Sequence, residues 1–318
     1  MHPLELWQAV VLGLVEGITE YLPVSSTGHL ILASQLMKLT DPAEQSALAA
    51  FEIVIQGGAI LAVLGLYWPS VVRMLKGLPG KDPQGFKLLV NLFIAFIPAA
   101  VVGLLLHKWI EQHLFNAAAV LLALGLGGLY MMAMDLRQEG RLGKAKFWQK
   151  TEMEVWDLSP RQALIIGLMQ CLAMWPGTSR SMMTITGGML AGLRPKQAAQ
   201  FSFLLGLPTL GAATVYSLYK NFHEAHKTQT QNLFQVLGGT ACVVGIAVAA
   251  VSAAAAIKWL VNFLTRHGLT PFGWYRIALC VVLLGLSLAG IVSITKPEAS
   301  RNSGTKVVPP VKWVEPQK

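Results

Sequence analysis

Charged residues are scarce in this chain. Asp, Glu, Lys and Arg make up 13% of its 318 residues, whereas soluble globular domains carry about 25%. Hydrophobic residues account for 54% of the sequence, and the mean hydropathy is +0.53. This shortage of charge excludes an ordinary soluble domain and indicates a protein that crosses a membrane several times.

Cysteine is rare as well, with three residues, Cys171, Cys242 and Cys280, all in apolar stretches. Their spacing excludes a disulfide framework and a paired-cysteine metal site, so we expect them to be packing residues. The net charge of +9 does not indicate nucleic-acid binding, because the sequence has no basic face with interleaved aromatic residues. The basic residues gather in loops instead, as the positive-inside rule predicts for membrane proteins.

Long apolar runs, in contrast, are abundant. A helix needs about 20 residues to cross about 30 Å of hydrocarbon, and six segments approach or exceed that length. They lie at about 46–68, 87–106, 117–135, 196–219, 233–257 and 273–294. The basic regions 69–87, 136–161 and 258–276, the last of which includes Arg276, are predicted to be cytoplasmic. Both termini would then lie outside.

Four further apolar segments are too short to span a bilayer, and they form two pairs. They lie at about 5–22, 24–39, 160–175 and 179–193. Pro23 separates the first pair, and Pro176 separates the second. Paired half-helices that meet at a polar break are typical of re-entrant hairpins, which are stable at membrane depth only where protein or water covers them.

The two predicted hairpins resemble each other in sequence. GLVEGITEYLPVSST at 13–27 aligns with GLMQCLAMWPGTSR at 167–180 with one gap, and FEIVIQGGAILAVL at 51–64 aligns with FSFLLGLPTLGAAT at 201–214. Each repeat would hold one hairpin and three spans. Because three is odd, the second copy must be inverted across the membrane, and the two hairpin tips can then meet near the bilayer midplane.

The sequence therefore predicts an all-α polytopic membrane protein with six transmembrane helices and two re-entrant helix hairpins in an inverted-topology repeat. Residues 1–295 would form a single integral membrane domain, with one repeat at about 5–135 and the other at about 160–294. The tail at 296–318 is polar, and we expect it to be disordered.

The first predicted tip carries two carboxylates at a depth where charge is costly. Glu16 and Glu20 are four residues apart and share one helix face. A charge at the bilayer centre costs about 2.5–3.5 kcal/mol even on the most lenient scale. The pair either lines a hydrated vestibule, acts as general acid and base, or binds a cation. Oxygen ligands of this kind suit Mg²⁺ or Ca²⁺.

Hydroxyl groups follow the first break, just before a histidine. The residues are Ser25, Ser26, Thr27, Gly28 and His29. Free N–H groups at the start of the next helix favour an anion such as phosphate, and Ser26 with His29 could form a nucleophile and its base. The simpler alternatives are N-capping by the hydroxyls and a hydrogen-bonded core histidine.

The second tip, PGTSRSMMT, repeats these hydroxyls in Thr178, Ser179 and Ser181 around Arg180. An intramembrane arginine needs an anionic partner, and its guanidinium matches phosphate oxygens in a bidentate manner. A structural ion pair with one of the two glutamates is the alternative, and one site can hold both. Behind the tips, four residues are expected to support the site: Glu52, Gln56, Gln170 and Ser181.

This set of groups suits phosphoryl transfer from a lipid phosphate or diphosphate that arrives through the bilayer. EGITEYLPVSSTGH at 16–29 closely resembles the signature of the undecaprenyl-diphosphate phosphatases, the bacitracin-resistance proteins, as do WPGTSRS at 175–181 and TGGML at 186–190. The resemblance covers about residues 5–294. Met182 stands where this family usually has glycine.

The resemblance implies a bacterial inner-membrane enzyme that hydrolyses undecaprenyl diphosphate, recycles the lipid carrier for peptidoglycan and confers bacitracin resistance, with its site open to the periplasm. It implies a divalent cation, Mg²⁺ or Ca²⁺, at Glu16 and Glu20. The implied catalytic set is Glu16, Glu20, Ser26, His29 and Arg180, and phosphate binding is expected from Ser25, Thr27, Gly28, Thr178, Ser179 and Arg180. The expected partners are a polyprenyl diphosphate and membrane lipids, without nucleic acid, and a homodimer is compatible with the pattern.

Two alternatives stay open at this point. Ser26 either attacks the terminal phosphorus or positions a water molecule that does so. A lipid flippase or transporter is the rival class, because inverted repeats with broken helices are a common transporter plan.

Overall fold

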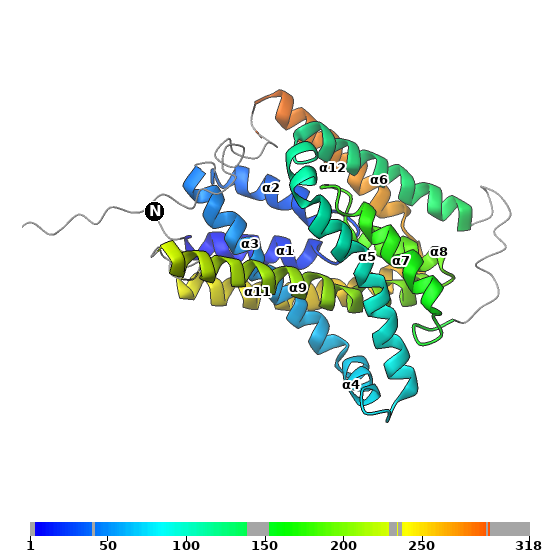
Figure 1. Ribbon diagram of the computed structural model, residues 1–318. Helices are drawn as coiled ribbons and strands as arrows, with labels where there is room; N and C mark the ends of the chain where they lie inside the picture. The colour runs from blue at the N-terminus through cyan, green and yellow to red at the C-terminus, as the bar shows by residue number, and fades with distance from the viewer. Residues whose placement is uncertain are drawn as a thin grey trace, which may run out of the picture.

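The computed structural model describes residues 4–39, 42–138, 153–228, 234, 237–290 and 292, and this part of the chain is helical without a β-strand. Six of its helices are long and apolar enough to cross a membrane, so the predicted number of spans is confirmed and the protein is a multi-pass membrane protein. They are α3 Pro42–Leu66, α5 Pro83–His113, α6 Ala117–Gln138, α9 Pro195–Thr228, α11 Gly239–His267 and α12 Thr270–Leu288 (Figure 1). The predicted tail at 296–318 lies outside the described residues.

Four short helices occupy the two predicted pairs. They are α1 Leu6–Thr19, α2 Ser26–Leu36, α7 Pro160–Leu172 and α8 Arg180–Leu190. The residues that precede α2 and α8, Ser25 and Ser179, share an unusual backbone, with φ of 73° and 77°. A side chain is rarely found in this left-handed region, and such strain tends to occur at functional sites. The two breaks predicted from Pro23 and Pro176 are therefore confirmed, and they have the same local geometry.

The region 69–87, predicted as a loop, contains an additional helix, α4 Trp68–Gly77. Arg73 of α4 forms an ion pair with Asp82 at 2.8 Å, and Asp82 accepts a hydrogen bond from the backbone N–H of Gly85 at the start of α5. The hydrogen bond from Arg73, followed by that from Gly85, holds the pKa of Asp82 below its usual value. This contact fixes the turn between α4 and α5.

The first helix of each short pair packs against a long helix from the other half of the chain. α1 packs along α11, and α7 packs along α5, while α3 contacts α9 and α6 contacts α12 (Figure 1). Close packing of α1 depends on small residues, because a Cβ atom at Gly13 would lie 2.7 Å from the carbonyl oxygen of Gly245, and one at Gly17 would overlap the carbonyl of Ala249. Helix α1, which carries Glu16 and ends just before Glu20, is thus fixed against α11.

Arg276 lies within the predicted span at 273–294, so it does not belong with the basic region 258–276. It lies within α12 and is fully buried, and its guanidinium donates to the carbonyls of Leu124 at 3.3 Å, Ala123 at 3.0 Å and Gly177 at 2.8 Å. A charge that is enclosed by three carbonyls contributes nothing to the positive-inside bias. Arg276 therefore does not indicate on which side of the membrane this region lies.

Asp135 of α6 fixes the start of α12. Its Oδ2 atom accepts hydrogen bonds from the backbone N–H groups of Leu269, at 2.7 Å, and Thr270. Replacing Asp135 with alanine should lower the free energy of unfolding by about 2 kcal/mol, because two buried donors lose a charged acceptor. Denaturant unfolding in detergent, followed by circular dichroism, measures this loss. Asp135→Asn keeps an acceptor and should lose less, and an alanine variant as stable as the wild type would contradict the expectation.

Candidate active site

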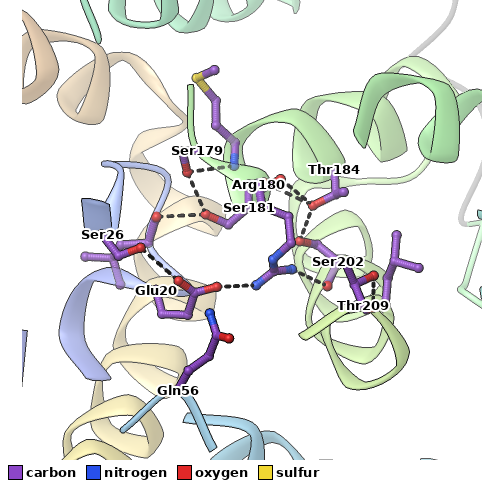
Figure 2. A network of polar contacts seen from close by, with 12 residues as sticks. Glu20, Ser26, Gln56, Ser179, Arg180, Ser181, Thr184, Ser202 and Thr209 are labelled. Carbon is purple, nitrogen blue, oxygen red and sulfur yellow. Dashed lines mark hydrogen bonds and ion pairs between the residues drawn. The ribbon is translucent and has the colours of Figure 1, made fainter. Parts of the chain in front are cut away.

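The two helix pairs meet at their breaks, as the sequence predicts. Arg180, the first residue of α8, donates through Nη2 to Oε1 of Glu20 at 3.1 Å (Figure 2). Ser181 donates to the carbonyl oxygen of Leu22 at 2.8 Å, which connects the second break to the first. The guanidinium carbon of Arg180 also lies 5.4 Å from the ring centroid of Tyr21, within the range of a cation–π contact. Residues about 160 positions apart therefore form one site.

Glu20 is the central group of this site. Its Oε1 atom accepts from Arg180, and its Oε2 atom accepts from the hydroxyl of Ser26 at 2.9 Å (Figure 2). Its side chain is only 8% exposed, so both contacts are made largely away from bulk water. A carboxylate that accepts the hydroxyl proton can remove it during attack. The geometry therefore makes Glu20 the partner of Ser26.

His29 does not pair with Ser26, and the simpler alternative of a hydrogen-bonded histidine is the one observed. Its Nδ1 atom lies 2.7 Å from the carbonyl oxygen of Ser25, and its Nε2 atom lies 2.6 Å from the hydroxyl of Tyr275 on α12. No hydrogen bond joins Ser26 and His29 in the described part of the chain. The physical reason is that the carbonyl one helical turn earlier holds one ring nitrogen, while α12 provides a partner for the other.

The Arg180 guanidinium is partly satisfied by protein. Nη1 donates to the carbonyl oxygen of Ser202 at 3.2 Å, whereas Nε is buried and has no hydrogen-bond partner among the described residues. The side chain is 11% exposed. The alternative of a structural ion pair with a glutamate is thus realised, and the Nε–H group remains for a further acceptor such as a phosphate oxygen.

Carboxylates outnumber the cation at this site. Glu16 is 2% exposed and interacts electrostatically with Glu20, Glu52 and Arg180. None of the hydrogen bonds among the described residues involves the Glu16 carboxylate. In the same part of the chain no group of three or more His, Cys, Asp or Glu could hold a metal by itself. Two carboxylates nevertheless fit Mg²⁺, which usually keeps waters and takes substrate phosphates as its other ligands.

The two helix starts differ in their capping. Ser179 caps α8, because its Oγ accepts from the backbone N–H of Met182 at 3.3 Å, and it also contacts the Ser181 hydroxyl at 3.0 Å. Ser25 makes no such side-chain bond at the start of α2, so capping by this hydroxyl is not observed. The first N–H groups of α2 therefore keep the capacity to bind an anion.

Three other predicted phosphate-binding residues have different surroundings. Thr178 is buried, and its backbone N–H donates to the carbonyl oxygen of Trp175. Thr27 is half-buried on the first turn of α2. Gly28 faces away from the site, since a Cβ atom there would contact Leu124 and Leu279 at 3.7 to 3.9 Å. Gly28 therefore lies on the side of α2 that faces α6 and α12, where a Cβ atom would make ordinary van der Waals contact.

Three of the predicted supporting residues lie on α3 and α7. The Thr214 hydroxyl donates to Oε1 of Gln56 at 3.4 Å, and Figure 2 shows the amide of Gln56 directed toward Glu20. The Thr209 hydroxyl donates to Oε1 of Gln170 at 3.4 Å. Glu52 is half-buried one helical turn before Gln56. Together these groups place polar contacts on α3, α7 and α9 around the carboxylates.

Several site residues were not predicted. Tyr21 and Ser202 both contact Arg180, and the sequence pattern indicates neither contact. Met182, where the related family usually has glycine, is fully buried in the core next to the site. Tyr275 and Arg276 were missed because the sequence WYRIAL stands at the start of a span, where aromatic and basic residues are common. An arginine next to a tyrosine inside an apolar run was the only available signal.

Comparison with known proteins identifies relatives along almost the whole chain. The model of the bacitracin resistance protein BacA family matches residues 9–282, which include every residue of the site. An undecaprenyl-diphosphatase of Polaromonas sp. is 42% identical over 290 residues, covering 91% of this chain and 98% of the relative. The enzyme of Sorangium cellulosum is 44% identical, covering 88% of this chain and 86% of the relative. The enzyme of Rhodospirillum rubrum is 43% identical, covering 91% of this chain and 97% of the relative.

Proposed function

Because this chain belongs to the BacA family of bacitracin resistance proteins, we propose that it is an undecaprenyl-diphosphatase of the bacterial inner membrane. It would hydrolyse undecaprenyl diphosphate to undecaprenyl phosphate and inorganic phosphate, which recycles the lipid carrier for peptidoglycan synthesis and confers bacitracin resistance. The observation that carries this proposal is the contact of Ser26 with Glu20 and of Glu20 with Arg180, formed at the junction of the two helix pairs. The names of the relatives give no support to a flippase.

In the proposed reaction, the terminal phosphate enters between the start of α2 and Arg180. Glu20 accepts the proton of the Ser26 hydroxyl as the oxygen attacks phosphorus, and the anhydride bond breaks, so undecaprenyl phosphate leaves. Water then releases phosphate from the phosphoserine. In the alternative route, Ser26 holds the water that attacks directly. In both routes Arg180 and the N–H groups of α2 stabilise the charge that develops on the phosphoryl oxygens.

A divalent cation is part of the proposal. Glu16 and Glu20 would hold it, and when bound it would neutralise diphosphate charge and polarise the phosphoryl oxygens. Both Glu20 oxygens already accept hydrogen bonds, whereas the Glu16 carboxylate accepts no hydrogen bond from the described residues. We therefore assign the larger share of cation binding to Glu16, and the orientation of Ser26 to Glu20.

The placement in the membrane completes the proposal. We take α1 with α2, and α7 with α8, as re-entrant hairpins that enter from opposite sides, as in an inverted repeat. The reciprocal packing of α1 on α11 and of α7 on α5 supports this, as does the shared backbone of Ser25 and Ser179. The site would open to the periplasm.

Phosphate release tests the proposed function. Purified protein in detergent should liberate inorganic phosphate from a long-chain prenyl diphosphate in the presence of Mg²⁺ or Ca²⁺. Chelation should lower the rate at least about tenfold, because the carboxylates of the site then repel the substrate, and added metal should restore it. A prenyl monophosphate serves as the control and should not be cleaved. Protein that releases no phosphate with either metal, while remaining folded, would overturn the proposal.

A further inference from the structure

Helix α12 contacts both breaks through two consecutive residues. The Tyr275 hydroxyl lies 2.6 Å from Nε2 of His29, just beyond the first break, and Arg276 donates to the carbonyl of Gly177 in the second. The His29 and Tyr275 rings are also stacked, with centroids 5.6 Å apart and an angle of 1° between their planes. Gly177 has a φ of 93°, and a Cβ atom there would lie 2.6 Å from the carbonyl oxygen of Val120.

The contacts of His29 determine which ring nitrogen carries the proton. A carbonyl oxygen can only accept, so Nδ1, at 2.7 Å from the Ser25 carbonyl, has to be the donor. In the neutral imidazole Nε2 is then an acceptor, and the Tyr275 hydroxyl donates to it. The tautomer and the direction of the ring are thus set from both sides, by α2 and by α12.

We infer that Tyr275 is a positioning residue for the reaction, an inference that rests on the function proposed above. It acts through His29, whose Nδ1 bonds the carbonyl of Ser25, at the start of α2, which carries Ser26. Its hydroxyl holds the Nε2 lone pair of His29 in a fixed direction, and its ring restricts rotation of the imidazole. Tyr275 is 47% exposed, whereas Arg276 beside it is fully buried and bonded to three carbonyls. The backbone at Tyr275 is therefore held in place by the buried Arg276 beside it, while the tyrosine side chain stays accessible.

Tyr275→Phe tests this role, because it removes the hydroxyl and keeps the stacked ring. We expect kcat for prenyl diphosphate hydrolysis to fall about tenfold, the loss typical of one hydrogen bond to a functional group, with KM changed less than about threefold. Tyr219→Phe on α9 is the matched control, since Tyr219 also stacks on a histidine, His223, with centroids 5.8 Å apart. It should leave kcat unchanged.

A spectroscopic measurement separates positioning from general loss of structure. In protein labelled with ¹⁵N-histidine, the His29 signals, assigned with a His29→Gln variant, should show a protonated Nδ1 in the wild type and a shifted Nε2 resonance in Tyr275→Phe. Wild-type kcat in Tyr275→Phe, or an unchanged His29 spectrum, would overturn the inference. If the wild type releases no phosphate, the proposed function fails, while the spectrum still decides whether Tyr275 holds His29.

Discussion

Replacing Arg180 with alanine is expected to lower kcat/KM for the lipid diphosphate about a thousandfold, because the site loses its preorganised donor to the phosphoryl oxygens. Arg180 is the cation that contacts Glu20 directly, at 3.1 Å, and its buried Nε keeps hydrogen-bonding capacity for a ligand. Removing it also leaves Glu20 without its counter-charge among several carboxylates. Substrate binding should weaken for the same reason, so KM should rise while kcat falls.

Arg180→Lys shows which property of the side chain matters. It retains the charge but lacks the planar fork, and we expect it to recover only part of the loss. Arg161→Ala, which changes an exposed arginine on α7, is the matched control and should keep full activity. Thermal unfolding in detergent has to be measured alongside, since an unpaired buried carboxylate destabilises a protein. A folded Arg180→Ala enzyme within about tenfold of the wild type would contradict the assignment.

The break positions were accessible from sequence because they are encoded locally, and the pairing of the two tips was accessible because the tips carry opposite charges. Pro23 and Pro176 end short apolar runs, and a buried arginine requires an acidic partner, which predicts a contact of Arg180 with Glu16 or Glu20. The choice between Glu16 and Glu20 was not accessible. It depends on the rotation of α1, which is set by contacts of Gly13 and Gly17 with α11 that lie far away in the sequence.

The contacts of His29 illustrate what sequence reasoning could not reach. Ser26 and His29 are three residues apart, and this spacing suggested a nucleophile and base. The structure instead bonds His29 to Tyr275, which is 246 residues away. Whether two nearby polar groups interact depends on competing partners from other helices, and α12 supplies such a partner. The same long-range packing buries Arg276, although its position at the start of a span is also typical of a basic residue at the membrane surface.

Replacing Glu20 with glutamine should lower kcat about a thousandfold, since a neutral amide cannot accept the Ser26 proton. The change is nearly isosteric, so the fold should persist. In the contact with Ser26, at 2.9 Å in the wild type, an amide then replaces the carboxylate. Glu154→Gln, at an exposed position, is the control and should be fully active. A titration with Mg²⁺ distinguishes the two roles of Glu20: if it acts only as a metal ligand, excess metal should restore the rate.

The double variant of Ser26 and Glu20 decides how the two residues act. If Glu20 works through the Ser26 hydroxyl, Ser26→Ala combined with Glu20→Gln should be no slower than the worse single variant, because groups that act as a unit are not additive. If water attacks directly and needs no help from Ser26, then Ser26→Ala should remain near wild-type activity while Glu20→Gln still loses its activity. Additive losses would show that the hydrogen bond between them is not part of the reaction, and would return His29 to the position of the general base.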